Sequence, residues 1–162
     1  MSEKTIWEQT GSLLITYNYT NEDDLKEFRK TLDQQLNTSK VERVIIIVSI
    51  PKGLDKNSLS PHFLIYFNSP SDYTFFGKLK DMQLENELKN SFDLLLSFGK
   101  VKRNIERYIH KMNISRKIMI NAELINDPSY ELELNSASDS PKEMVNFVIN
   151  TLQKIDTNEQ YV

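Results

Sequence analysis

Short apolar runs recur along the chain and predict buried β-strands. Three runs are almost continuously apolar, which is typical of strands covered on both faces: residues 12–18 (SLLITYN), 41–50 (VERVIIIVSI) and 92–98 (FDLLLSF). Two more strands are predicted at 62–67 and 116–122. The segment 130–135 (YELELN) alternates apolar and polar residues, so it predicts a half-exposed edge strand, with antiparallel pairing left open as an alternative.

Segments with helical periodicity separate these strands. The predicted helices cover approximately residues 20–36, 79–90, 101–112 and 140–155. Thr20 with Asp23 suggests a capping box at the start of the first helix. Ser140 with Glu143 suggests another at the start of the last helix, where Pro141 suits the first turn.

The order of these elements indicates an α/β protein. Strands that alternate with helices favour a mostly parallel sheet between two helical layers. We therefore predict a three-layer sandwich with five or six strands, of flavodoxin-like or Rossmann-like type. The length of 162 residues suits a single domain, with a compact part at about 11–155 and loose ends at 1–10 and 156–162.

Composition narrows the functional classes. The chain has no cysteine, which excludes disulfides, cysteine nucleophiles and thiolate metal sites and favours a reducing, cytoplasmic location. It has no apolar run long enough for a transmembrane helix and no apolar leader, so we expect no membrane partner. The net charge of −3 argues against a nucleic-acid partner, because nucleic-acid-binding domains are usually basic.

The end of the first predicted strand carries groups that suit a phosphate. Thr16 and Asn18 stand there, followed by Thr20 and Asn21. In a flavodoxin-like fold, hydroxyl and backbone N–H groups of this loop hold a phosphate at a helix N-terminus. The loop has no glycine, and the acids at 22–24 would repel a phosphate. We therefore favour a plain helix cap beside an exposed tyrosine, with the phosphate site as the alternative.

A second candidate site follows the strand at 92–98. Ser97, Gly99 and Lys100, followed by Lys102 and Arg103, occupy its carboxyl end, which is the edge where open α/β sheets bind ligands. Residues 98–117 hold seven Lys/Arg and one acid, a net charge of +6. The phosphate-loop motifs GxxxxGK[ST] and GxGxxG are absent, so we favour a solvated basic helix face. An anion site at this edge is the alternative.

An aromatic cluster lies in the segment 69–78 (SPSDYTFFGK), which contains Tyr73, Phe75 and Phe76. We favour packing of these rings against the core, because large aromatic side chains gain most from burial. If the rings are exposed instead, they mark a partner surface.

Recognisable catalytic and metal-binding motifs are absent from the sequence. His62 and His110 are far apart, and neither shows an acid or a second histidine at ligand spacing, so no metal is expected. There is no GxSxG elbow. Asp93 lies in a buried strand, and we interpret it as a structural hydrogen-bond partner at the strand end. We expect no cofactor and favour a protein that is not an enzyme.

Several motifs together resemble a family of small uncharacterised bacterial α/β proteins. They are GSLLITYN, VERVIIIV, FFGKLKD, FDLLLSF and ISRKIMINA, and the resemblance covers about residues 11–155. It implies a fold but brings no catalytic residues. The last two motifs are also similar to the acceptor-side half of two-domain glycosyltransferases that use nucleotide sugars. That similarity implies shared architecture rather than shared activity, because the donor is bound mainly by the other domain.

The functional expectation is a protein-interaction module that acts through a protein partner or a second copy of the chain. The alternative is a binder of a phosphate-containing small ligand or nucleotide at the carboxyl edge of the sheet.

Overall fold

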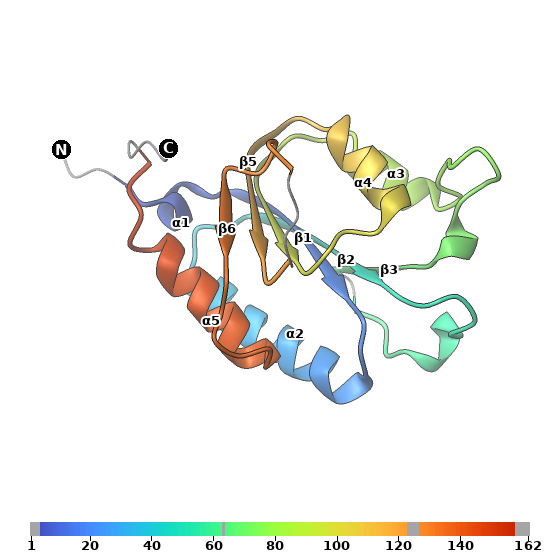
Figure 1. Ribbon diagram of the computed structural model, residues 1–162, viewed down its shortest axis with the longest axis horizontal. Coiled ribbons are helices and arrows are strands. Elements are labelled where there is room, and N and C mark those ends of the chain that lie inside the picture. Colours follow the sequence, from blue (N-terminus) through green and yellow to red (C-terminus); the bar gives the residue numbers. More distant parts are fainter. Residues whose placement is uncertain (1–3, 63, 123–126, 158–162) are drawn as a thin grey trace.

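The computed structural model describes residues 4–62, 64–122 and 127–157, and its centre is a six-stranded sheet (Figure 1). The strands are β1 (Ser12–Asn18), β2 (Arg43–Ser49), β3 (Ile65–Asn68), β4 (Phe92–Phe98), β5 (Ile114–Ile120) and β6 (Leu132–Leu134). The helices are α1 (Ile6–Gln9), α2 (Glu22–Asn37), α3 (Met82–Glu87), α4 (Arg103–His110) and α5 (Pro141–Leu152), with two 3-10 turns, η1 (Lys56–Ser58) and η2 (Pro70–Asp72).

All six strands run parallel, in the order β3-β2-β1-β4-β5-β6. The winding direction of the chain reverses between β1 and β4, which creates a topological switch point at the carboxyl ends of these two strands. The predicted three-layer α/β fold is therefore confirmed. The predicted edge strand at 130–135 is also found, as β6, but the antiparallel alternative is wrong because β6 pairs with β5 in parallel.

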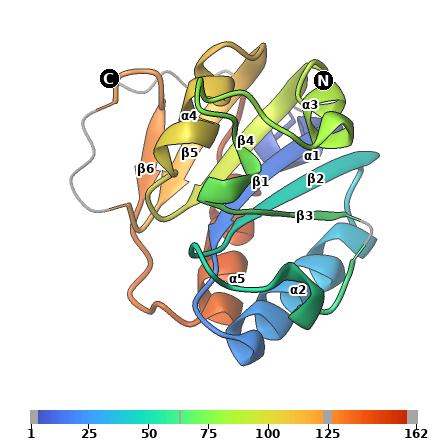
Figure 2. The same ribbon diagram turned by 90° about the vertical axis from the view of Figure 1, so that its right-hand side faces the viewer.

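Helices cover both faces of the sheet (Figures 1 and 2), and a hydrophobic core lies on each face. On one face, Ile15 of β1 is buried with Phe28 of α2 beneath the layer formed by α2 and α5. On the other face, Leu14 is buried with Ile105 beneath α3 and α4. Successive residues of a strand point to opposite faces, so a strand with a core on each side is apolar throughout. This explains the continuous apolar runs in β1, β2 and β4.

The N-terminal segment is ordered and packed, so the prediction of a loose end at 1–10 is wrong for the residues that the structure describes. Thr5 caps α1 in a capping box with Glu8. Ile6 and Trp7 are buried, and the Ile6 N–H donates to the Ile155 carbonyl at 2.8 Å.

The loose end predicted at 156–162 is also wrong for its described residues, because Asp156 forms a bridge with Thr5 and the Thr157 N–H donates to the Lys4 carbonyl at 3.2 Å. Residues 1–3 and 158–162 lie outside the described residues, as does residue 63 of the predicted third strand.

The cap of α2 lies one residue later than predicted. The side chain of Asn21 accepts a hydrogen bond from the Asp24 N–H at 2.8 Å, which makes Asn21 the N-cap. The Thr20 hydroxyl instead donates to the Asp24 carboxylate at 3.0 Å. Asn and Thr are both good N-cap residues, so the sequence alone does not separate two neighbouring candidates.

At α5, Ser140 occupies the N-cap position and Pro141 the first turn, as predicted. The predicted capping box with Glu143 is not formed. The Ser140 hydroxyl donates to the Glu27 carboxylate of α2 at 3.4 Å and makes no cap hydrogen bond. This contact joins α5 to α2, its neighbour in the same layer. No helix of the described residues is long and apolar enough to cross a membrane.

Replacement of Trp7 by alanine tests whether the N-terminal segment belongs to the core. Trp7→Ala should lower the free energy of unfolding by about 3–5 kcal/mol, because it empties a buried site of a large aromatic side chain. Urea unfolding followed by circular dichroism measures this. Gln9→Ala, at an exposed position of the same helix, is the control and should have little effect. Equal stability of the two variants would show that the segment is loose after all.

Candidate functional site

A row of polar residues ends the three strands on one side of the switch point. Asn18 is the last residue of β1, Ser49 of β2 and Asn68 of β3. The parallel register pairs Asn18 with Ser49 and Ser49 with Asn68. Because residues paired in this way share a face, all three side chains lie on the side of the sheet covered by α3 and α4.

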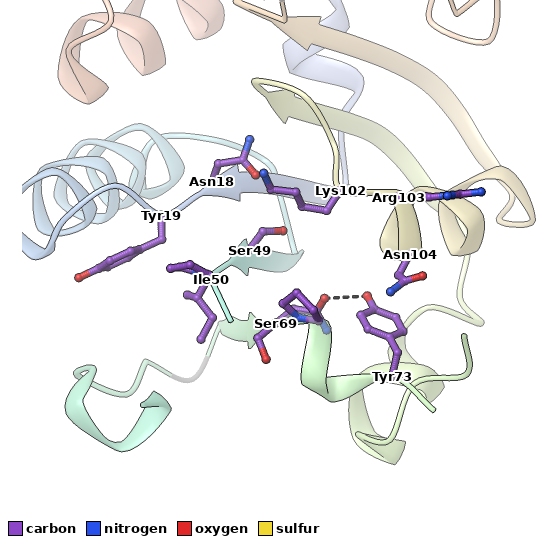
Figure 3. Close-up of a pocket in the computed structure, with 12 residues that line it drawn as sticks. Asn18, Tyr19, Ser49, Ile50, Ser69, Tyr73, Lys102, Arg103 and Asn104 are labelled. Carbon is purple, nitrogen blue, oxygen red and sulfur yellow. Dashed lines mark hydrogen bonds between the residues drawn. The ribbon is translucent and has the colours of Figure 1, made fainter. Parts of the chain in front are cut away.

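A cavity of about 420 Å³ lies over this polar row (Figure 3). Its walls come from the loops that follow β1, β2 and β3 and from the start of α4. The lining residues are Asn18, Tyr19, Ser49, Ile50, Pro51, Asn68, Ser69, Pro70, Tyr73, Lys102, Arg103 and Asn104. The cavity thus occupies the position where open α/β sheets bind their ligands, outside the carboxyl ends of the strands.

The electrostatic character of the cavity favours an anion. Lys102 and Arg103 line it, and none of its described lining residues is an acid. Lys102 is also the N-cap of α4 and supplies no side-chain cap hydrogen bond. The N–H groups of the first helical turn have no partner within a helix, and the helix dipole places partial positive charge there. Two cations and a helix N-terminus therefore adjoin one cavity.

The far wall of the cavity is held by a buried hydrogen bond. The Tyr73 hydroxyl donates to Asn68 Oδ1 at 2.6 Å (Figure 3). Burial raises the pKa of the Tyr73 phenol above its ordinary value, and the bond to Asn68 offsets only part of this rise. The phenol is therefore a neutral donor. With Oδ1 of Asn68 engaged, the group left on that amide is a donor, as an anionic ligand requires.

Asp72 supports the same wall from behind. It accepts hydrogen bonds from the Ser69 N–H at 2.7 Å and from the Lys56 ammonium, so it joins η1 to η2. Burial alone would raise the pKa of the Asp72 carboxyl, but the bonds from Lys56 and Ser69 outweigh burial and hold the pKa below its ordinary value. The Asp72 charge thus helps to position Ser69 and Pro70 of the cavity wall.

Of the residues predicted from sequence to bind a ligand, Asn18 lines the cavity. Gly99 and Lys100 do not line it. Gly99 has a φ of +81°, and a Cβ at this position would lie 3.1 Å from Asn18 Nδ2. That nitrogen donates to the Lys100 carbonyl at 2.9 Å. Gly99 therefore lets Asn18 reach the backbone of the β4–α4 loop, while the Lys100 side chain is exposed and is not among the lining residues.

Thr16 of β1 and Ser97 of β4 are paired in register on neighbouring strands. Thr16 lies two residues before Asn18, on the same face of β1 and further from the cavity. Both are buried. The Ser97 hydroxyl lies 3.1 Å from that of Tyr130, and the Thr16 hydroxyl has no hydrogen-bond partner among the described residues. The structure therefore places them in the core layer beneath α4 rather than on the cavity surface.

The three aromatic residues of the segment 69–78 differ in burial. Tyr73 is buried in the cavity wall, as the packing interpretation predicts. That interpretation is wrong for Phe75 and Phe76, whose side chains are 97% and 90% exposed. They occupy a turn that stands away from the core.

Asp93 and His110 both form contacts between distant segments of the chain. Asp93 accepts hydrogen bonds from the N–H groups of Gly11 and Ser12 at 2.8 and 3.0 Å, so it is the expected structural partner, although its side chain is exposed rather than buried. The prediction that His110 lacks an acid at ligand spacing is wrong.

His110 Nε2 lies 3.4 Å from Glu106 and 3.5 Å from Asp127. These three groups converge closely enough to hold a metal ion. Pairing of the imidazole with the two carboxylates explains the same geometry without a metal, and Arg103, Arg107 and Lys111 beside them disfavour a cation.

The comparisons with known proteins find no family model and no curated protein that matches the chain.

Sequence reasoning missed most of the cavity. Lys102 and Arg103 belonged to the predicted anion site, but Ser49 and Asn68 did not. One signal could have found Ser49 and Asn68, because each is the polar residue that ends an apolar strand. In a parallel sheet such residues gather at one edge. Which of them are neighbours depends on the strand order, which the sequence does not contain.

Alanine at Gly99 tests the contact with Asn18. Gly53 also has a positive φ, of +95°, but no atom lies within 4 Å of a Cβ built there, so Gly53→Ala isolates the backbone strain. Gly53→Ala should cost about 1 kcal/mol of unfolding free energy. Gly99→Ala should cost more, because it also displaces Asn18. Chemical denaturation measures both variants, and equal losses would contradict the proposed role.

The Asp72 carboxyl should make stability depend on pH. Since folding lowers its pKa, the ionised group stabilises the fold above the ordinary pKa of about 4, and this contribution is lost as the pH falls through the folded value. Asp72→Asn should therefore be less stable than the wild type at pH 7 and approach it below about pH 4. Urea unfolding across this range measures the difference. A stability difference that does not change with pH would contradict this role of the Asp72 charge. Lys56→Gln should reproduce part of the loss.

Proposed function

We propose that the protein binds a small anionic ligand that carries a phosphate group. The observation that supports this best is the cavity itself. Lys102 and Arg103 line it at the start of α4, and none of the described lining residues is an acid. Phosphates bind at helix N-termini because unpaired N–H groups and the helix dipole both favour negative charge. Lysine and arginine side chains add charge-assisted hydrogen bonds.

The rest of the cavity suits an organic group attached to the phosphate. A volume of about 420 Å³ lies in the range of small-molecule sites. Ile50, Pro51 and Pro70 add apolar surface, and the Tyr19 ring lies at one side, next to Ile50 (Figure 3). The polar row opposite them can bind hydroxyl or amide groups. A nucleotide combines a phosphate, a sugar and a flat apolar ring, so it fits this division of the cavity better than phosphate alone.

Binding, rather than catalysis, agrees best with the lining residues. The described lining includes no histidine, aspartate or glutamate, the side chains that most often transfer protons near neutral pH. Burial raises the pKa of Tyr73 further from neutrality. A reducing intracellular location agrees with the absence of cysteine from the sequence. The resemblance to small bacterial α/β proteins stays a prediction.

Thermal unfolding with paired ligands tests the proposal. AMP and adenosine differ only in the phosphate, so AMP should raise the midpoint of unfolding by several degrees at saturating concentration and adenosine should raise it less. FMN, a hexose phosphate and inorganic phosphate extend the panel. If none of the phosphate-containing probes stabilises the wild type, the proposal fails.

Charge removal then locates the site. Lys102→Gln should weaken the affinity for the best probe about tenfold or more, since a hydrogen bond to a charged group contributes about 1.5–3 kcal/mol. The double variant Lys26→Gln/Lys30→Gln removes two charges from α2 on the opposite face of the sheet and should leave the affinity unchanged. Equal effects of both variants would mean that the ligand responds to overall charge and not to this cavity.

A further inference from the structure

The segment 74–78, which we call the aromatic tip, forms a tight and well-anchored turn. The Gly77 N–H donates to the Thr74 carbonyl at 2.9 Å, and the Thr74 N–H donates to the Lys78 carbonyl at 2.7 Å. At its base, Tyr73 and Leu79 form an antiparallel bridge. The Leu79 N–H donates to the Tyr108 hydroxyl of α4 at 2.7 Å. The turn is therefore fixed to α4, and Figure 1 shows it standing out beside that helix.

Two phenylalanines occupy the outer corner of this turn. Phe75 and Phe76 are the most exposed large hydrophobic side chains of the described residues, and their rings meet edge to face at a centroid distance of 5.4 Å. Apart from each other, they keep almost all of their surface in water. Exposure of contiguous apolar surface is unfavourable, and such surface commonly marks a binding site. Because the backbone hydrogen bonds hold the turn, its position does not depend on burial of the rings.

Cations surround the tip on the side of α4. Phe76 shares a surface depression with Lys78, Arg107 and Lys111. Arg107 and Lys111 follow Arg103 of the cavity at four-residue spacing and continue the same side of α4, and we call these two residues the basic face. Glu106, the single acid between residues 98 and 117, pairs with His110. The basic face therefore keeps a net positive charge, in a chain whose total is −3.

We propose that the aromatic tip and the basic face bind the surface of an anionic lipid bilayer. Aromatic side chains that enter the boundary between headgroups and acyl chains, with basic residues beside them, are the combination that holds proteins at such surfaces. A projecting tip can enter a fluid interface, whereas a protein partner would need a cavity shaped for two rings. The uneven charge distribution also orients the basic face toward a negative plane. The sequence-based expectation of no membrane partner rested on the absence of a spanning segment, which peripheral binding does not need.

Vesicle sedimentation tests this proposal with the full chain. Vesicles of phosphatidylcholine with about 30 mol % phosphatidylserine should bind the protein, and pure phosphatidylcholine vesicles should bind it much more weakly. The double variant Phe75→Ser/Phe76→Ser should lower the partition coefficient about tenfold or more, because it removes the apolar surface that enters the interface. Both side chains are exposed, so this variant should fold normally, which circular dichroism verifies.

Charge variants separate the lipid site from the ligand cavity. Arg107→Gln/Lys111→Gln should also weaken binding to anionic vesicles, and Lys26→Gln/Lys30→Gln on α2 should not. Added salt of about 0.5 M should reduce the binding, since exposed charges are screened. The cavity residue Lys102 is left intact in all of these variants. Absence of vesicle binding would therefore not contradict the proposed ligand site.

Three results would overturn the lipid proposal. The first is wild-type protein that shows no preference for anionic vesicles, and the second is a Phe75→Ser/Phe76→Ser variant that binds these vesicles as strongly as the wild type. The third is a dimer in sedimentation equilibrium that Phe75→Ser/Phe76→Ser converts to a monomer, since the tip would then be occupied by a second copy of the chain.

Discussion

The parallel register of β1, β2 and β3 is the constraint on which the candidate site depends. Each of these strands ends on a polar residue, and the register places Asn18, Ser49 and Asn68 side by side. A shift of one residue in any strand would turn its polar end toward the α2 and α5 core. The apolar residues within the strands prevent such a shift, because each face has its own core to fill. The hydrophobic interior thus determines where the polar edge lies.

The switch point adds the second part of the site. Beyond β1 the order of the strands reverses, so the β4–α4 loop crosses over the end of β1 and brings the start of α4 to the cavity. Asn18 joins the two halves through its hydrogen bond to the Lys100 carbonyl. Gly99 permits this contact, because a side chain there would press against the Asn18 amide. The glycine and lysine that sequence reasoning treated as ligand-binding residues therefore position a neighbouring residue that does line the cavity.

The sequence was informative where one physical force acts locally. Continuous apolar runs predicted β1, β2 and β4 because burial on both faces leaves no other composition. It was less informative where two residues compete for one role, as Thr20 and Asn21 do at the α2 cap. It failed where distant segments meet. The burial of Trp7, the pairing of His110 with Asp127 and the assembly of the cavity all depend on contacts between elements far apart in the chain. Exposure of Phe75 and Phe76 also contradicts the usual preference of aromatic residues.

The charge distribution of α4 links the two surfaces. Cations near a helix N-terminus oppose the helix dipole and typically cost about 0.3–1 kcal/mol each. Lys102 and Arg103 stand at that position, and the N-cap supplies no compensating side chain. An anion in the cavity would remove this conflict, because it would pair with the cations and with the N–H groups of the first turn. Arg107 and Lys111, nearer the C-terminus of the helix, experience no such conflict and extend the same charge toward the aromatic tip. The cations of α4 thus form two groups that differ in their relation to the helix dipole. Only Lys102 and Arg103 destabilise the helix by their position, and a bound anion would relieve this.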